Sequence, residues 1–111
     1  MTQLHQDLTK EKWHSLSLFE QMANVGAEVG RTINWRIKNK EKSTAAIERG
    51  LELLDLTIED KKNKMHLKEL CRLREVLADY FYFDNEYQST DQHWNEYFLP
   101  FNYASAIKKG L

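Results

Sequence analysis

The sequence predicts an all-α protein, built as an up-and-down four-helix bundle with a long first helix and a Pro-kinked fourth helix. Apolar residues recur along the chain at steps of three and four, which is the period of an amphipathic helix. One proline and four glycines in 111 residues leave few signals for the turns that many short strands would need. A chain of this length is expected to form a single helical domain over 1–111, with 1–9 as a flexible N-terminal arm.

The first predicted helix runs from Lys10 or Trp13 to Lys38. Its inward stripe consists of Phe19, Met22, Ala23, Gly26, Val29, Gly30, Ile33 and Ile37. Glycine in a helix costs about 1 kcal/mol relative to alanine. Because Gly26 and Gly30 have no side chain, they indicate a close approach by a neighbouring helix.

The second and third predicted helices are separated by a polar turn. The second begins near Ser43 or Thr44, either of which can cap it, and its core seam is Ile47, Leu51, Leu54 and Ile58. Residues 60–64 are polar and predict the turn. The third helix is predicted from Met65 to Phe83, with Leu67, Leu70, Leu73, Leu77, Tyr80 and Phe81 facing inward.

The fourth predicted helix follows a break in the pattern at residues 84–86. Ser89, Thr90 and Asp91 offer a cap for it. Its inward face is Trp94, Tyr97, Phe98, Phe101 and Ala104. Pro100 lacks an N–H and clashes with the preceding turn, so it is expected to kink or split this helix.

Ten of the thirteen aromatic residues lie between Tyr80 and Tyr103. Such a segment is half of the core, a docking surface, or both. Tyr82 and Tyr87 fall off the inward seam. We therefore expect any ligand or peptide groove where the third helix ends and the fourth begins, unless the end of the fourth helix folds back over these two tyrosines.

A second candidate surface is the outward stripe of the first helix. The candidate dimer-interface residues are Trp13, Asn24, Glu28, Arg31 and Trp35. Two tryptophans on a polar face need cover, and a second copy, a terminal arm or the end of the fourth helix can each supply it. The spacing of Glu28 and Arg31 predicts an ordinary surface ion pair.

Arg74 is the most unusual charge, because it falls inside the apolar arc of the third helix. It must extend to solvent or pair with an acceptor. Structural pairing with Glu20 or Glu48 is one interpretation, and an anion-binding role is the other. The candidate binding residues taken together are Arg31, Trp35, Arg74, Tyr82 and Tyr87.

The sequence shows no pattern for catalysis or for a bound cofactor. The histidines are scattered and lack the helical spacing of a metal site: His5, His14, His66 and His93. Cys71 has no evident base nearby and is interpreted as a partly buried, inert thiol. No glycine-rich phosphate loop is present. We expect no catalytic residue, no metal and no cofactor.

Composition restricts the environment and the partners. The formal net charge of −1 argues against a general nucleic-acid binder. A single cysteine fits a reducing compartment. No apolar run is long enough to span a bilayer, and the first residues do not resemble a secretory signal, so we expect a cytoplasmic protein without a membrane partner. Lysines gather toward one predicted end of the bundle, where they form either a solvated face or a surface for an anionic partner such as RNA.

Three stretches resemble small all-helical prokaryotic proteins to which we attach no activity: SLFEQMANVGAEVGR, LCRLREVLADYF and DNEY. This resemblance covers most of the chain and implies the helical fold alone. In size and bundle architecture the chain also resembles the helical ribonucleases of the HEPN class, whose signature is an Arg followed four to six residues later by His. Here Arg74 is followed at that distance by Asp79, with no His, so only the architecture carries over.

These observations favour a noncatalytic binding or accessory protein that acts through a homodimer or another protein partner. The alternative is an RNA- or nucleotide-processing component of the toxin–antitoxin type. A buried, paired Arg74 favours the first interpretation. A basic cleft with Arg74 exposed beside Tyr82 or Tyr87 favours the second.

Overall fold

The computed structural model describes residues 10–108, with side chains through Ala104. Over this range every regular element is a helix and no strand is present, which confirms the all-α prediction. The elements in chain order are α1 (Lys10–His14), α2 (Leu18–Trp35), α3 (Lys40–Glu59), the 3-10 helix η1 (Lys61–His66), α4 (Leu67–Tyr82) and α5 (Asp91–Lys108).

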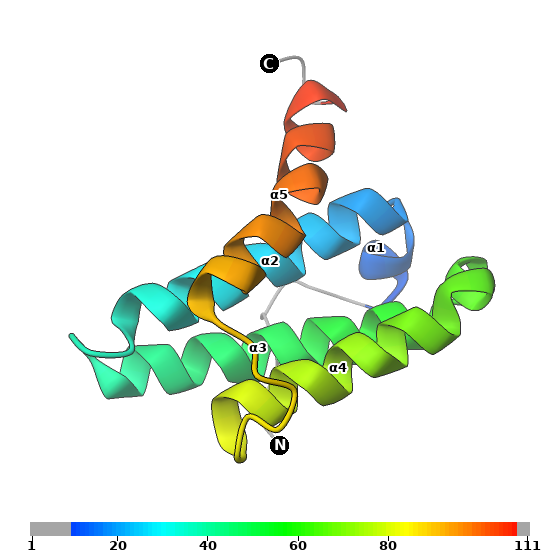
Figure 1. Cartoon of the computed structure of the whole chain (residues 1–111). Helices are drawn as coiled ribbons and strands as arrows, with labels where there is room; N and C mark the ends of the chain where they lie inside the picture. Colours follow the sequence, from blue (N-terminus) through cyan, green and yellow to red (C-terminus); the bar gives the residue numbers. More distant parts are fainter. Residues whose placement is uncertain (1–9, 109–111) are drawn as a thin grey trace.

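Helices α2, α3 and α4 run back and forth, and α5 crosses α2 (Figure 1). The core lies between them and consists mainly of Trp13, Met22, Val25, Val29, Leu53, Leu54, Leu70, Leu73, Leu77, Trp94 and Phe98. Beyond the crossing, the second half of α5 stands clear of α3 and α4 in this view. Because α5 crosses its neighbour at a steep inclination, the up-and-down four-helix arrangement is not confirmed.

The long first helix predicted from Lys10 or Trp13 to Lys38 is wrong, because the chain breaks between α1 and α2. The cause is a capping box at Ser17. The Ser17 hydroxyl accepts from the Glu20 backbone N–H at 3.2 Å, and the Glu20 carboxylate accepts from the Ser17 N–H at 3.0 Å. This pair satisfies backbone donors that begin a new helix. Helix α2 then ends at Trp35.

The second predicted helix begins earlier than expected. Its cap is Asn39, whose side chain accepts from the Lys42 backbone N–H at 3.1 Å, and not Ser43 or Thr44. Ser43 is buried instead and donates to the Thr32 carbonyl at 2.8 Å, joining α3 to α2. A serine on an amphipathic helix can act either as a cap or as a buried donor, and here Asn39 caps the helix about one turn earlier, which leaves Ser43 inside it.

The later boundaries are close to the predictions. The polar turn is the 3-10 helix η1, and α4 ends one residue before the predicted Phe83. Thr90 caps α5, because its hydroxyl accepts from the His93 N–H at 3.1 Å. Pro100 lies inside α5, and the predicted kink there is not confirmed. The predicted flexible arm, 1–9, lies outside the described residues.

Candidate functional site

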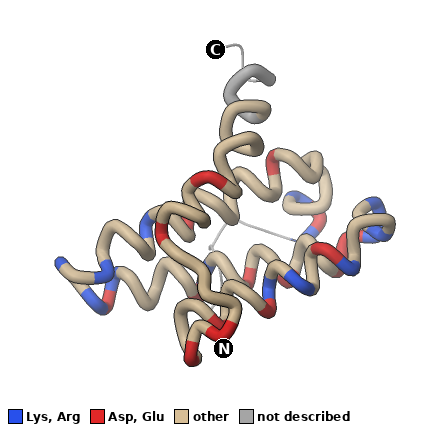
Figure 2. Tube along the Cα trace, in the orientation of Figure 1, with Lys and Arg blue, Asp and Glu red and all other residues tan. Residues whose placement is uncertain are grey.

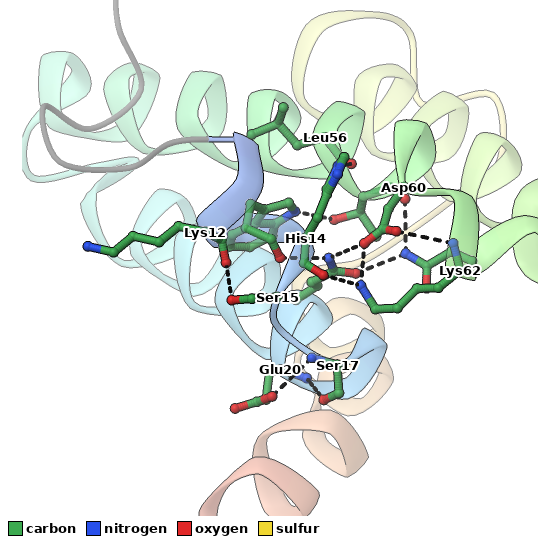
Figure 3. A network of polar contacts seen from close by, with 12 residues as sticks. Lys12, His14, Ser15, Ser17, Glu20, Leu56, Asp60 and Lys62 are labelled. Atoms are coloured by element: carbon green, nitrogen blue, oxygen red, sulfur yellow. Dashed lines mark hydrogen bonds and ion pairs between the residues drawn. The ribbon is translucent and has the colours of Figure 1, made fainter.

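A buried polar network fastens α1 and α2 to the end of α3 (Figure 3). The indole N–H of Trp13 donates to the Thr57 hydroxyl at 3.1 Å. The Gln21 amide donates to the Trp13 carbonyl at 3.0 Å and to Asp60 at 2.9 Å. Gln21 and Thr57 are fully buried, so water cannot reach their polar groups, and these hydrogen bonds satisfy them instead. The network fixes the short α1 helix against the body.

The same network holds the start of η1. Asn63 is buried and donates to the Gln21 side chain at 2.9 Å and to the Thr57 carbonyl at 3.0 Å. Lys62 donates to Asp60 and to the His14 carbonyl. Because groups from α1, α2, α3 and η1 meet here, the turn after α3 has a defined conformation.

The Asp60 carboxyl has a lowered pKa. Burial alone would raise this pKa, but hydrogen bonds from Lys62 and Gln21 favour the charged form and outweigh burial. Asp60 also caps η1, accepting from the Lys62 backbone N–H at 3.1 Å. Sequence analysis missed this centre. The available signal was Gln21, a polar residue on the buried face between Leu18 and Val25.

Beyond the network, η1 leads into a basic turn, which we define as residues 61–68. It carries four lysines and no acidic residue: Lys61, Lys62, Lys64 and Lys68. Figure 2 shows these cations at the end of the molecule where α3 passes into α4. Lys61, Lys64 and Lys68 form no ion pair with a described residue, and Met65 between them is 94% exposed.

The outer side of α5 forms an apolar surface at another part of the molecule. Leu99 is 62% exposed and Tyr103 is 69% exposed, while Tyr97 is also exposed. Phe19 of α2 and Tyr97 are exposed at a different side of α5, since Phe19 packs 5.7 Å from Phe101, next to the core residues Trp94 and Phe98. We name Leu99 and Tyr103 the α5 surface. Tyr97 and Phe19 were expected in the core, and they are exposed because α5 crosses α2 and leaves one side uncovered.

The outward stripe of the first helix is only partly as predicted. Trp13 is in the core and not on an outward face, because the break before α2 turns α1 back onto α3. Glu28 is buried as well, and it faces Arg31 at 3.1 Å and Arg49 at 3.4 Å. The expected surface pair is therefore a buried carboxylate between two arginines, of which Arg31 remains exposed.

The remaining stripe residues lie near the surface. The side chain of Asn24 is exposed and donates to the Glu20 carbonyl at 2.8 Å. Trp35 is half-buried, and the Lys42 ammonium lies 4.4 Å from the centre of its ring. A lysine from the same molecule thus already covers part of this tryptophan.

Arg74 is paired, but not with Glu20 or Glu48. Its guanidinium binds Asp55 of α3 through two bonds, at 2.6 Å and 3.3 Å. Both side chains are close to half exposed, so this pair lies at the surface of the α3–α4 contact. The guanidinium points away from the apolar arc of α4 and toward Asp55, a partner that the helical wheel of one helix could not indicate.

A hollow of about 610 Å³ lies where α4 ends, as the sequence predicted for a groove, and it brings Arg74 and Tyr87 together. Its acidic lining residues are Glu75, Asp79, Asp84 and Glu86. Asp79 is buried and accepts from the backbone N–H groups of Glu86 and Tyr87, so it shapes the loop. Tyr82 lines a separate hollow between α3 and α4. Tyr82 and Tyr87 are 47% and 42% exposed, as expected.

A third hollow of about 550 Å³ separates α4 from α5. Its walls include Leu73, Val76 and Trp94, with Lys68 and Arg72 at the rim. Arg72 stacks over the ring of Tyr87, at 5.0 Å from its centre. The hollow is an open, mostly apolar depression, and Tyr97 of α5 also lines it.

Within the described part of the chain, no three His, Cys, Asp or Glu side chains come together in a way that could hold a metal ion. Cys71 is exposed, and not partly buried as predicted. Among the described helices, none has both the length and the apolar character to cross a membrane.

No protein-family model matches the sequence, and comparisons with curated proteins and with solved structures give no match. The resemblance to helical prokaryotic proteins therefore stays a prediction.

Proposed function

We propose that this chain is a noncatalytic binding protein that works as a homodimer, with the α5 surface at the interface. The observation that carries the proposal is the exposure of Leu99 and Tyr103, two large apolar side chains on the side of α5 that faces away from α2. Contiguous apolar patches on soluble proteins mark interaction sites more often than they stand free.

The charge content of α5 supports this proposal. Between Gln92 and Ile107 the helix has one charged side chain, Glu96. Helix α3, of similar length, carries eight charged residues. A helix without a charged face is typical of one that is covered on all sides. Helix α2 covers only the Trp94–Phe98 side of α5.

A second copy fits this surface better than a charged partner does. An interface core is depleted in charge and enriched in aromatic residues. Because the α5 surface has almost no charge to complement, a charged partner would lose water there without gaining an ion pair. The same surface on a second copy has matching chemistry, and a two-fold axis places the patch against itself. Tyr103 can keep its hydroxyl at the wet rim.

The other interpretations have weaker support. The outward stripe of the first predicted helix is a weaker candidate interface, because Trp13 and Glu28 are buried. The RNA-processing alternative required a basic cleft around Arg74. The hollow that holds Arg74 is lined by four carboxylates, and Asp55 engages its guanidinium. A reducing compartment such as a prokaryotic cytoplasm is part of the proposal, because Cys71 has no second cysteine in the sequence.

Sedimentation equilibrium of the full chain tests the proposal, with a reducing agent present so that exposed Cys71 cannot cross-link. The unmodified chain is expected to be dimeric at tens of micromolar. Leu99→Lys and Tyr103→Lys are each expected to shift it to monomer, because a lysine in the interface core would be desolvated without a partner. Both positions are exposed, so the helical circular dichroism of the monomer is expected to stay unchanged.

Phe83→Lys is the matched control, since Phe83 is 73% exposed but lies at the end of α4, away from the α5 surface. It is expected to leave the dimer intact. A monomeric unmodified chain at these concentrations would refute the homodimer. A dimer that Leu99→Lys and Tyr103→Lys both leave intact would place the interface elsewhere.

A further inference from the structure

The basic turn combines charge with exposed apolar side chains. Met65 is 94% exposed and Leu67 is 42% exposed. They lie among Lys61, Lys64 and Lys68, and no carboxylate lies between residues 61 and 68. A cluster of cations around apolar tips matches the chemistry of an interface that is anionic outside and apolar beneath.

The basic turn is fixed to the rest of the molecule by a buried side chain. The buried Asn63 side chain fastens η1 to α2 and α3 through Gln21 and the Thr57 carbonyl (Figure 3). Asp60 is already engaged by Lys62 and Gln21, so it does not neutralise the three remaining lysines. The arrangement presents Met65 outward on a fixed support, which lowers the conformational cost of binding.

We propose that the basic turn binds an anionic lipid surface peripherally. Met65 and Leu67 enter the interface, while Lys61, Lys64 and Lys68 contact the headgroups. No spanning helix is needed for this contact. The proposal therefore departs from our expectation of no membrane partner, which rested on the lack of an apolar run long enough to cross a bilayer.

The exposed side chains favour a lipid surface over RNA. Proteins that hold single-stranded RNA stack successive bases on aromatic rings, and the basic turn has no Phe, Tyr or Trp, with the imidazole of His66 as its single ring. Met65 and Leu67 would add nothing to a contact with the phosphate backbone. An apolar side chain gains free energy only where it leaves water, as it does among lipid acyl chains.

The α2–α3 connection supplies a matched comparison within the same chain. Ile37 there is 96% exposed and also has cationic neighbours. However, Arg36 is paired with Asp91, and Glu41 follows nearby. Ile37→Asp therefore introduces the same kind of change as Met65→Asp, at the other end of α3 and in a less basic setting.

Co-sedimentation with vesicles tests the proposal. The full chain is mixed with vesicles of phosphatidylcholine alone, or of phosphatidylcholine with about one third phosphatidylserine. Binding is expected only with phosphatidylserine, and it should weaken as salt rises from about 0.1 M to about 0.5 M because the charges become screened. Each change of Lys61, Lys64 or Lys68 to Gln is expected to lower the affinity about fivefold. Met65→Asp should lower it by at least about tenfold, and Ile37→Asp should leave it unchanged.

Several outcomes would overturn the proposal. They are equal binding to both kinds of vesicle, no binding to either, or loss of binding by Ile37→Asp and not by Met65→Asp. Binding to single-stranded RNA that Met65→Asp leaves intact, without binding to vesicles, would assign the basic turn to nucleic acid instead. Met65 is almost wholly exposed, so a variant with unchanged circular dichroism separates lost binding from lost folding. The Leu99→Lys variant, tested in parallel, shows whether binding depends on the dimer.

Discussion

Phe98 of α5 packs directly on the backbone of Gly26 in α2. A Cβ atom built at position 26 would lie 2.8 Å from the Cβ of Phe98, closer than real side chains approach. At Gly30, one turn later, no atom lies within 4 Å of such a Cβ. The close helix approach predicted from the two glycines is therefore confirmed at Gly26 and wrong at Gly30.

This difference predicts that the same substitution, glycine to alanine, has opposite effects on stability at the two positions. Gly26→Ala is expected to destabilise the chain by about 1–3 kcal/mol, because α5 must shift away from α2. Gly30→Ala should stabilise it by up to about 1 kcal/mol, because alanine favours the helix and meets no neighbour. Urea unfolding followed by circular dichroism measures both. If the two variants were equally stable, the Phe98 contact would not limit the approach of the helices.

Stability is expected to fall in acid because of Asp60. The pKa of its carboxyl is lower in the folded chain than in the unfolded chain. The carboxylate therefore contributes its full stabilisation above the unfolded pKa, near 4, and this is lost as pH falls through the folded pKa. The free energy of unfolding should decrease between about pH 5 and pH 3.

Asp60→Asn isolates this contribution from other carboxylates. The variant keeps the side-chain shape but cannot titrate. It should be less stable than the unmodified chain at pH 7, and the difference should shrink as the pH falls. A difference that is constant from pH 7 to pH 3 would contradict the assignment to Asp60.

Arg31→Glu is expected to weaken the fold of the monomer. Arg31 faces the buried Glu28 carboxylate, so a glutamate at position 31 would bring a second negative charge beside it. Arg31→Gln removes the attraction without adding repulsion, and it should cost less. Thermal unfolding at low salt should rank the unmodified chain above Arg31→Gln and Arg31→Glu last. If both variants unfolded at the same temperature, Arg31 and Glu28 would not be coupled.

Helical period predicted the elements well, because α2, α3 and α4 bury one stripe each. The seam residues Leu54, Leu70, Leu73 and Leu77 are all in the core. The helical period could not show that the chain breaks at Ser17. Residues 10–14 are themselves helical, and it is the capping box of Ser17 and Glu20 that starts a separate helix, α2. The period also could not give the direction of α5, which depends on the contact between Phe98 and Gly26.

The candidate sites were harder to predict because they depend on partners from other helices. Trp13 was placed outside on a continuous wheel, whereas its indole bonds to Thr57, which is 44 residues away in the sequence. A hollow lies at the end of α4, where a groove was expected, but of Tyr82 and Tyr87 only Tyr87 lines it, and binding of a ligand or peptide there stays a prediction. Helical period could not indicate the acidic lining of this hollow, because Asp79 accepts from the backbone N–H groups of Glu86 and Tyr87 and so folds the loop around itself.

The contact between Arg74 and Asp55 predicts a small, salt-dependent coupling. A double-mutant cycle of Arg74→Met and Asp55→Asn is expected to give about 0.2–1 kcal/mol at low salt, because both side chains are close to half exposed and water screens the pair. The coupling should decrease when salt is added. This result would assign Arg74 to the α3–α4 contact.

Zero coupling at low salt would contradict the structural pairing and leave the guanidinium free for an anion. Arg72→Met is the matched control, since Arg72 lies two residues earlier on α4 and stacks on Tyr87. Combined with Asp55→Asn, it should show no coupling, because Arg72 has no contact with that carboxylate. A coupling of equal size for both arginines would mean that Asp55 acts through the general field of α4 and not through a specific bond to Arg74.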